Sequence, residues 1–397
     1  MRKNFNWRSL SMGAVAASLV VLAAGSVDPN DPDAPDEVQT PNAALGIPSD
    51  DNASDAPIIE NPNVNVSNPS IVISADKGFD YASINLTGVW DDEAAEWLKL
   101  YGTGASNQNL WVTVDDAPKG VDVYNNSDEN SKKLIADVVF LVDNSGSMGE
   151  EAEAVASSIM EWSTMLSESG LDLMVGCVGY GDATTAIDGA INITTSAELN
   201  SWMEKNGYGI YRTHYFGGED ADKLRQLATG SEYRNGAYNE CGMVALHFAH
   251  DNFNFRSGSN RIYVNFTDEP NQPYGIEKWS VEYLNPLNGN WKTNYGTVHT
   301  VFSEYENYYS YSNLWDEKPW LMSDYTGGTT LFTDRYFTDF TLKNIPVTGA
   351  MQNSYILRIT NIAAYFDGQE HKVTITVFDK NGKIQAEKSV YFNFGTK

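Results

Sequence analysis

Between residues 134 and 345, short apolar runs alternate with segments that have the spacing of amphipathic helices. The run Val138–Val142 is too short to span a membrane and lacks a helical period, which is typical of a buried parallel strand. Because such runs and helical segments alternate, we predict a doubly wound, Rossmann-like α/β domain with a mainly parallel sheet. The predicted strands cover residues 135–142, 171–182, 261–270, 296–304 and 328–334, with a further short strand near 186–194. The predicted helices cover 150–168, 196–206, 220–229, 236–251 and 276–284, and a final helix follows the last strand.

The segments on either side of this domain have the alternation that is typical of antiparallel strands. Residues 67–133 and 346–397 contain short runs of alternating apolar and polar positions, separated by turn residues. Asn381-Gly382 lies between two such runs and predicts a hairpin. Neither segment is long enough for a complete sandwich. We therefore predict that they are two parts of one β-sandwich, with the α/β domain (134–345) inserted between them.

The amino terminus has the pattern of an export signal. A basic start is followed by a short apolar stretch over residues 12–25, which predicts a cleaved signal peptide at 1–25 and not a membrane anchor. Ser26 stands where a lipoprotein would have its lipid-carrying Cys, so lipidation is not supported. Residues 26–66 are acidic and rich in Pro, which predicts an extended linker. The expected location is outside the cytoplasm: secreted, periplasmic or on the surface of a bacterium.

Net charge limits the classes of partner. The chain has 26 Lys and Arg residues against 53 Asp and Glu, a formal charge of −27, which argues against nucleic acid and anionic membranes as partners. The two cysteines, Cys177 and Cys241, allow either one internal disulfide or two buried free thiols.

Candidate chemistry begins where the first buried strand ends. Asp143, Ser145 and Ser147 follow Val142 at alternate positions, so in extended backbone their oxygens converge on one point. A carboxylate and two hydroxyls form a hard, all-oxygen set that suits Mg²⁺ or Mn²⁺ better than zinc or copper. Asp268 ends the next buried strand and would reach the same edge of the sheet. The alternative is that Ser147 only caps the following helix, although a cap alone requires neither Asp143 nor Asp268.

At these residues the chain resembles the von Willebrand factor type A (VWA) family. The family's metal-ion-dependent adhesion site (MIDAS) has the pattern D-x-S-x-S after the first strand, which Asp143, Ser145 and Ser147 match. The resemblance implies that Asp268 approaches a Mg²⁺ ion (or Mn²⁺ or Ca²⁺) and that a partner's Asp or Glu completes the metal shell. It also implies a Thr in a further loop. Here Glu219 or Asp220 is expected in that place, because Thr213 comes several residues too early.

Aromatic residues are concentrated in two loops that we expect at the same edge of the sheet. Tyr308, Tyr309 and Trp315 are candidate contacts for a protein or glycan ligand, since Tyr and Trp are favoured at recognition surfaces. The alternative is that these side chains pack on one another and hold a long loop together.

Enzyme motifs are incomplete in this chain. Neither Ser145 nor Ser147 fits the G-x-S-x-G nucleophile elbow. His247 and His250 lack the glutamate of H-E-x-x-H and are expected to be core or surface residues. We therefore predict a non-enzymatic, metal-dependent adhesion module of an exported bacterial protein. A subunit of a surface structure such as a pilus is the alternative, and a hydrolase is disfavoured.

Overall fold

The computed structural model describes residues 45–74, 80–91, 93–125, 135–149, 151–168, 171–181, 186–234, 240–303, 316–334, 349, 351 and 353–396. The predicted signal peptide and the first part of the linker lie outside these residues, as do Tyr308, Tyr309 and Trp315. Within the described ranges, no helix is both long and apolar enough to cross a lipid bilayer.

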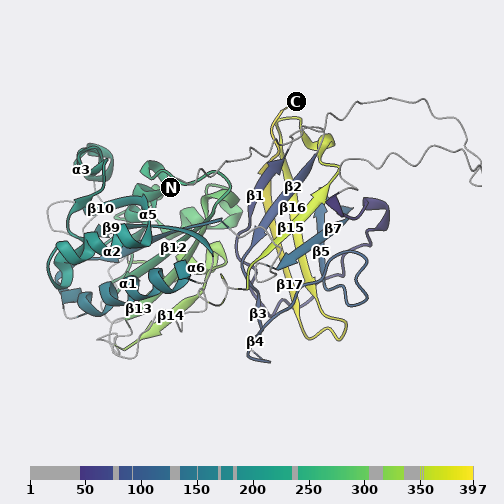
Figure 1. Ribbon diagram of the computed structural model, residues 1–397, viewed down its shortest axis with the longest axis horizontal. Coiled ribbons are helices and arrows are strands. Elements are labelled where there is room, and N and C mark those ends of the chain that lie inside the picture. The colour runs from purple at the N-terminus through teal and green to yellow at the C-terminus, as the bar shows by residue number, and fades with distance from the viewer. Residues whose placement is uncertain are drawn as a thin grey trace, which may run out of the picture. The chain divides into compact units, whose positions relative to one another are not determined.

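A seven-stranded sheet with the order β11-β10-β9-β8-β12-β13-β14 forms the centre of the α/β domain (Figure 1). Its strands are β8 (Ile135–Asp143), β9 (Asp172–Tyr180), β10 (Ile187–Thr194), β11 (Phe216–Gly217), β12 (Asn260–Thr267), β13 (Thr297–Ser303) and β14 (Thr330–Thr333). Strands β9, β8, β12, β13 and β14 are parallel, which confirms the mainly parallel sheet. Strand β10 runs antiparallel to β9, and β11 runs parallel to β10. This reversal determines at which edge the loop after β11 emerges.

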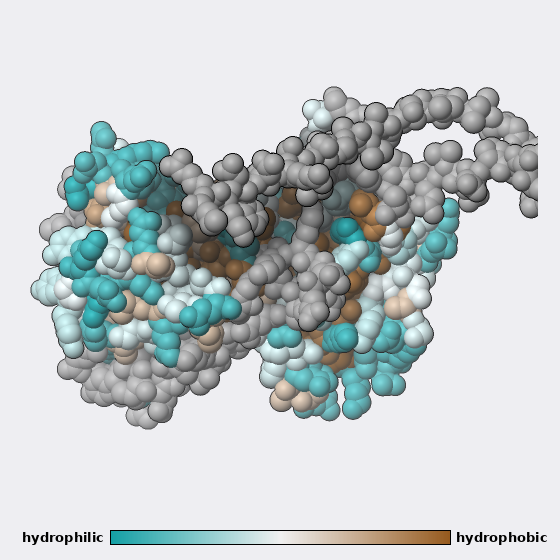
Figure 2. Space-filling model, in the orientation of Figure 1, coloured by the Kyte–Doolittle hydropathy of each residue, from teal (hydrophilic) through white to brown (hydrophobic). Residues whose placement is uncertain are grey.

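Both faces of this sheet are covered by helices. These are α1 (Ala152–Glu168), α2 (Ser196–Lys205), α3 (Ala221–Ala228), α4 (Ser231–Arg234), α5 (Gly242–Asn252) and α6 (Leu321–Thr326). Successive residues of β8 enter two different hydrophobic clusters: Phe140 packs against Trp162 of α1, whereas Leu141 belongs to the cluster that contains α5. The outer surface over α1 and α2 is mainly hydrophilic (Figure 2), as expected for helices that bury one face.

The remaining strands form two four-stranded antiparallel sheets, with the orders β1-β2-β15-β7 and β17-β16-β5-β6. They are β1 (Ser70–Ser74), β2 (Tyr81–Leu86), β5 (Leu110–Val114), β6 (Ala117–Lys119), β7 (Val121–Asn125), β15 (Tyr355–Thr360), β16 (Glu370–Phe378) and β17 (Gln385–Asn393); β3 (Trp90–Asp91) and β4 (Glu96–Trp97) make a separate hairpin.

The two flanking segments pair with each other. β15 lies between β2 and β7, and β16 pairs with β5, so each sheet contains strands from before and after the α/β domain. One hydrophobic cluster draws on both sheets and includes Ile84, Val112 and Ile375. This is the arrangement of a β-sandwich. The predicted hairpin around Asn381-Gly382 connects β16 to β17.

The second part of the predicted linker lies against this sandwich. Asp50, in a short 3₁₀ helix η2 (Asp50–Asn52), pairs with the buried Lys119 at 2.5 Å and accepts a hydrogen bond from the Gly120 N–H at 2.9 Å. Further along, the Asn63 N–H donates to the Gln385 carbonyl at 2.8 Å. Residues 45–66 are therefore part of the folded unit, because their polar groups satisfy partners on the sandwich.

One predicted helix is replaced by shorter elements. Residues 276–284 form two 3₁₀ helices, η6 (Glu277–Trp279) and η7 (Val281–Leu284). Ser280 separates them with an extended backbone, and its hydroxyl accepts a hydrogen bond from the Glu282 N–H. The apolar spacing was suitable for a helix, but the serine favours a new helix start at this position. Two more 3₁₀ turns follow, η8 (Pro286–Asn288) and η9 (Thr293–Tyr295).

Candidate metal centre

Four of the six predicted metal-binding residues meet at the carboxyl ends of two neighbouring strands. Because β8 and β12 are adjacent and parallel, Asp143 at the end of β8 and Asp268 directly after β12 emerge at the same edge of the sheet. Asp143 is fully buried. Its Oδ1 accepts a hydrogen bond from the Ser145 N–H (2.8 Å), and its Oδ2 accepts one from the Thr267 hydroxyl (2.7 Å). These two bonds fix the orientation of the carboxylate.

A chain of hydroxyl contacts connects the two strand ends. After β8 the backbone turns through a short 3₁₀ helix, η4 (Gly146–Gly149). The turn brings the Ser145 and Ser147 hydroxyls to 2.9 Å from each other, and the Ser147 hydroxyl donates to Asp268 Oδ1 at 3.1 Å. The structure thus brings together Asp143, Ser145, Ser147 and Asp268. A helix-cap role for Ser147 accounts for neither of its two contacts.

A third loop reaches this edge before β11. The 3₁₀ helix η5 (Gly209–Thr213) is held to α1 because Arg212 pairs with Glu153 at 2.7 Å. The hydroxyl of Thr213 donates to the side-chain oxygen of Asn144, which lies between Asp143 and Ser145 in the sequence. Thr213 is thus closer to the site than its position in the sequence suggested.

The carboxyl groups of this site have higher pKa values than carboxyl groups on an ordinary polar surface. Burial raises the pKa of Asp143 well above its ordinary value, and the negative charges of Asp268 and Glu240 raise it further. The pKa of Glu240 is raised to about 7, first by burial and then by the charges of Glu269, Asp268 and Asp316. The carboxylates at this edge therefore repel one another, and a bound cation would relieve the repulsion.

Glu219 and Asp220 do not join the site, contrary to prediction. Because β10 and β11 run opposite to β8 and β9, the loop after β11 emerges at the edge where β8 begins. There the Asp220 carboxylate accepts a hydrogen bond from the Asn192 side chain at 2.5 Å, and Glu219 is exposed. The sequence analysis predicts a strand near residues 186–194 but not its direction, and the antiparallel direction of β10 places this loop at the other edge.

Sequence reasoning missed Glu240 and Thr267. Glu240 lies just before α5, and α5 leads into β12, so its loop must emerge at the same edge as Asp143. The place of Glu240 in the order of helices and strands was the signal that could have identified it from the sequence. Thr267 precedes Asp268 and supports Asp143 through its hydroxyl, which only the register of β8 and β12 reveals.

The donor set fits a hard divalent cation. It consists of carboxylate and hydroxyl oxygens, which Mg²⁺ and Mn²⁺ prefer and which Ca²⁺ also accepts. In the described part of the chain, no three His, Cys, Asp or Glu side chains lie close enough together to hold a metal by themselves. A cation at this edge would therefore also need the Ser145 and Ser147 hydroxyls as ligands.

The other candidate ligands for metals are core residues. His247 is buried against Trp279 and Tyr283, and burial lowers its pKa to about 3. His250 packs on Tyr295, and burial lowers its pKa to about 4. Both cysteines are free, buried thiols.

No protein-family model matches the chain, and no curated protein matches it. Solved structures share limited similarity with it. Proximal thread matrix protein 1 from the mussel byssus is 12% identical, with a TM-score of 0.31, over 51% of this chain and 45% of that one. The pilus adhesin SpaC from Lactobacillus rhamnosus GG is 11% identical, with a TM-score of 0.32, over 81% and 48%. The minor pilin PilB from Streptococcus sanguinis is 12% identical, with a TM-score of 0.30, over 75% and 77%. The chain thus spans about half the length of the first two, and similarities at this level define neither its fold family nor its function.

Proposed function

We propose that this chain is an exported adhesion protein of the VWA type, which binds a protein partner through a divalent cation at the end of β8. Asp143, Ser145, Ser147 and Asp268 would hold the cation. The observation that carries this proposal is the continuous hydrogen-bonded path from the Ser145 hydroxyl through Ser147 to Asp268, because it joins the ends of two adjacent parallel strands with oxygen ligands alone.

The residues around the cation would decide how a partner is selected. Thr267 and the Ser145 N–H hold the Asp143 carboxylate in place. Glu240, whose pKa is raised to about 7, is partly ionised at neutral pH and disfavours an acidic partner when no cation is present. A bound Mg²⁺ would supply positive charge and an exchangeable position for a carboxylate of the partner. Selective binding of acidic groups would therefore depend on the metal.

Exposed aromatic side chains lie on the loop that contacts this edge. Tyr208, Tyr211 and Tyr215 have exposed fractions of 73%, 56% and 50%. They flank Thr213, which is anchored to Asn144 beside Asp143. Large, rigid aromatic surfaces of this kind favour protein contacts at low entropic cost. These tyrosines support an adhesive role more directly than Tyr308, Tyr309 and Trp315, which remain predictions.

Calorimetric titration of Mg²⁺ and Mn²⁺ into the full chain tests the proposal. We expect one saturable site in the wild type and none in Asp143→Asn, which keeps the size of the side chain but removes its charge. Asp222→Asn is the matched control, because Asp222 is exposed on α3. Saturable binding that survives in Asp143→Asn, or no binding to the folded wild type, would refute the proposal.

A further inference from the structure

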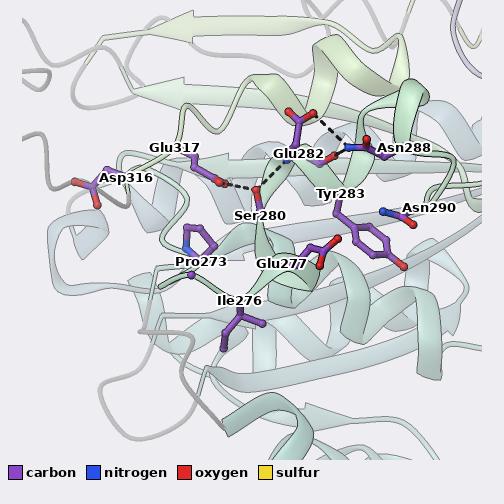
Figure 3. A pocket seen from close by; sticks show the side chains of 11 residues that line it. Pro273, Ile276, Glu277, Ser280, Glu282, Tyr283, Asn288, Asn290, Asp316 and Glu317 are labelled. Carbon is purple, nitrogen blue, oxygen red and sulfur yellow. Dashed lines mark hydrogen bonds between the residues drawn. The ribbon is translucent and has the colours of Figure 1, made fainter.

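A pocket of about 340 Å³ lies beside η6 and η7 on the α/β domain (Figure 3). This volume is within the range of ligand-binding pockets in proteins. Residues that follow β12 and residues that precede α6 provide its walls; they include Ile276, Glu277, Tyr283, Asn290, Asp316 and Glu317.

One wall of the pocket is fixed by an internal carboxylate. Glu317 accepts hydrogen bonds from the Ser280 hydroxyl (2.6 Å), the Val281 N–H (2.8 Å) and the Asn271 side chain (2.9 Å). These bonds tie the segment before α6 to the start of η7. The pocket is therefore part of the folded framework, and Glu317 has a structural role in it.

The opposite wall of the pocket contains Tyr283 and Glu277, which can contact a ligand. Tyr283 projects into the space that these residues line (Figure 3). Its ring packs edge-to-face with the His247 ring, with 4.9 Å between the ring centroids. Glu277 is exposed, and its carboxylate has no hydrogen-bond or ion-pair partner among the described residues. An aromatic face beside an available carboxylate suits a flat cation.

The charge of the lining selects the class of ligand. Four of the eleven lining residues are acidic, namely Glu277, Glu282, Asp316 and Glu317, and none of the eleven is Lys, Arg or His. Hydrogen bonds from Tyr325 and Asn285 lower the pKa of Glu282, so it is charged at neutral pH. The net charge of −27 on the chain would also attract cations over distance.

We propose that this pocket binds an arginine side chain of a protein partner, with the guanidinium on the Tyr283 ring and its N–H groups directed to Glu277. Arginine fits better than lysine, because a planar guanidinium both stacks on an aromatic ring and donates in a fork to a carboxylate. The inference does not depend on the proposed metal site, although the charge of Asp316 also acts on Glu240 there.

The test compares two peptides that differ only in charge. Acetyl-Gly-Arg-Gly-amide and its citrulline analogue, which has the same shape and no charge, are titrated into the full chain in the presence of EDTA. Nuclear magnetic resonance reports the binding. We expect the arginine peptide to bind at least about fivefold more tightly, and this preference to decrease at high salt.

Substitutions then locate the binding. Glu277→Gln should weaken binding of the arginine peptide by about three- to tenfold, and Tyr283→Leu should also weaken it. Glu96→Gln is the control, because it removes the same charge from an exposed position in the β3–β4 hairpin. Equal binding of the citrulline peptide, or unchanged binding in Glu277→Gln, would overturn the inference. Calorimetry with Mg²⁺ on Glu277→Gln should be unchanged, which separates failure of this pocket from failure of the metal site.

Discussion

Strand β8 contains two fully buried aspartates, of which one is paired with a cationic side chain and the other, among the described residues, is not. Asp137, near the start of the strand, accepts hydrogen bonds from the Arg256 side chain (2.6 Å) and from its backbone N–H (2.7 Å). Asp143, at the end, accepts only from neutral donors, and none of the described cations lies within ion-pair distance of it. The carboxylate at one edge of the sheet is thus paired by the chain itself, whereas the carboxylate at the other edge has no cation from the described residues and is available to an external one.

The largest effect on stability is expected at the edge where Arg256 pairs with Asp137. Arg256→Met leaves Asp137 buried without a cation and should lower the free energy of unfolding by about 3–5 kcal/mol. Urea denaturation measures this loss. Arg225→Met is the control, because the pair of Arg225 with Asp222 is exposed and contributes less than about 1 kcal/mol. Equal losses in the two variants would contradict the special role of the Asp137 pair.

At the other edge, the hydroxyl groups should control metal affinity more than stability. Ser147→Ala removes the group that joins Ser145 to Asp268. We expect Mg²⁺ affinity to fall about tenfold, or about 1.4 kcal/mol, as measured by calorimetry. Ser157→Ala, at an exposed position on α1, should leave the affinity unchanged. If Ser147→Ala also left it unchanged, the hydroxyl path would have no part in binding.

In the sandwich, His371 lies between two carboxylates, and the charge of its imidazole depends on pH. Nδ1 of His371 lies 2.6 Å from Asp115 and Nε2 lies 3.0 Å from Asp367. Burial lowers the pKa of His371, but hydrogen bonds with the two carboxylates outweigh this effect, so the net shift is upward.

Because the pKa of His371 is raised in the folded state, its stabilisation is fully present below the unfolded pKa of about 6.5. It is lost as pH rises through the higher folded value. We expect a loss of less than about 1 kcal/mol, since both carboxylates are half-exposed. Urea denaturation across this pH window should show the loss in the wild type and not in His371→Gln. An identical pH dependence of the two proteins would rule out the effect.

The smallest effect on metal binding is expected at Asp220, because the direction of β10 and β11 places it at the other edge of the sheet. Asp220→Asn should change Mg²⁺ affinity by less than about twofold, because Asp220 lies at the edge where β8 begins. Glu240→Gln, which removes the same charge near Asp143, should reduce the affinity several-fold by calorimetry. The opposite ranking of these two variants would restore the original sequence interpretation.

The sequence predicted those features that depend on local pattern. The run Val138–Val142 ending in Asp143 identified the central strand. The alternate oxygens at Asp143, Ser145 and Ser147 identified one half of the candidate site. Asp268 could be added because a second buried strand also ended in an acid. The Asn381-Gly382 turn identified the hairpin from β16 to β17.

Features that depend on the direction of a strand could not be predicted in this way. β10 pairs antiparallel to β9, a direction that its apolar pattern does not specify, and this reversal places Asp220 away from the site. The same reversal brought Thr213 to Asn144. The pairing of Thr267 with Asp143 depends on the register between β8 and β12, which no local pattern specifies.

The most direct test of the central claim, that the Asp143 carboxylate binds an external cation, is the unfolding free energy of the wild type and Asp143→Asn in EDTA and in Mg²⁺. At a Mg²⁺ concentration of about one hundred times its dissociation constant, the wild type should gain about 2.7 kcal/mol. Asp143→Asn should gain nothing. Equal stabilisation of both proteins, or none of the wild type, would contradict the claim that Asp143 binds a metal ion.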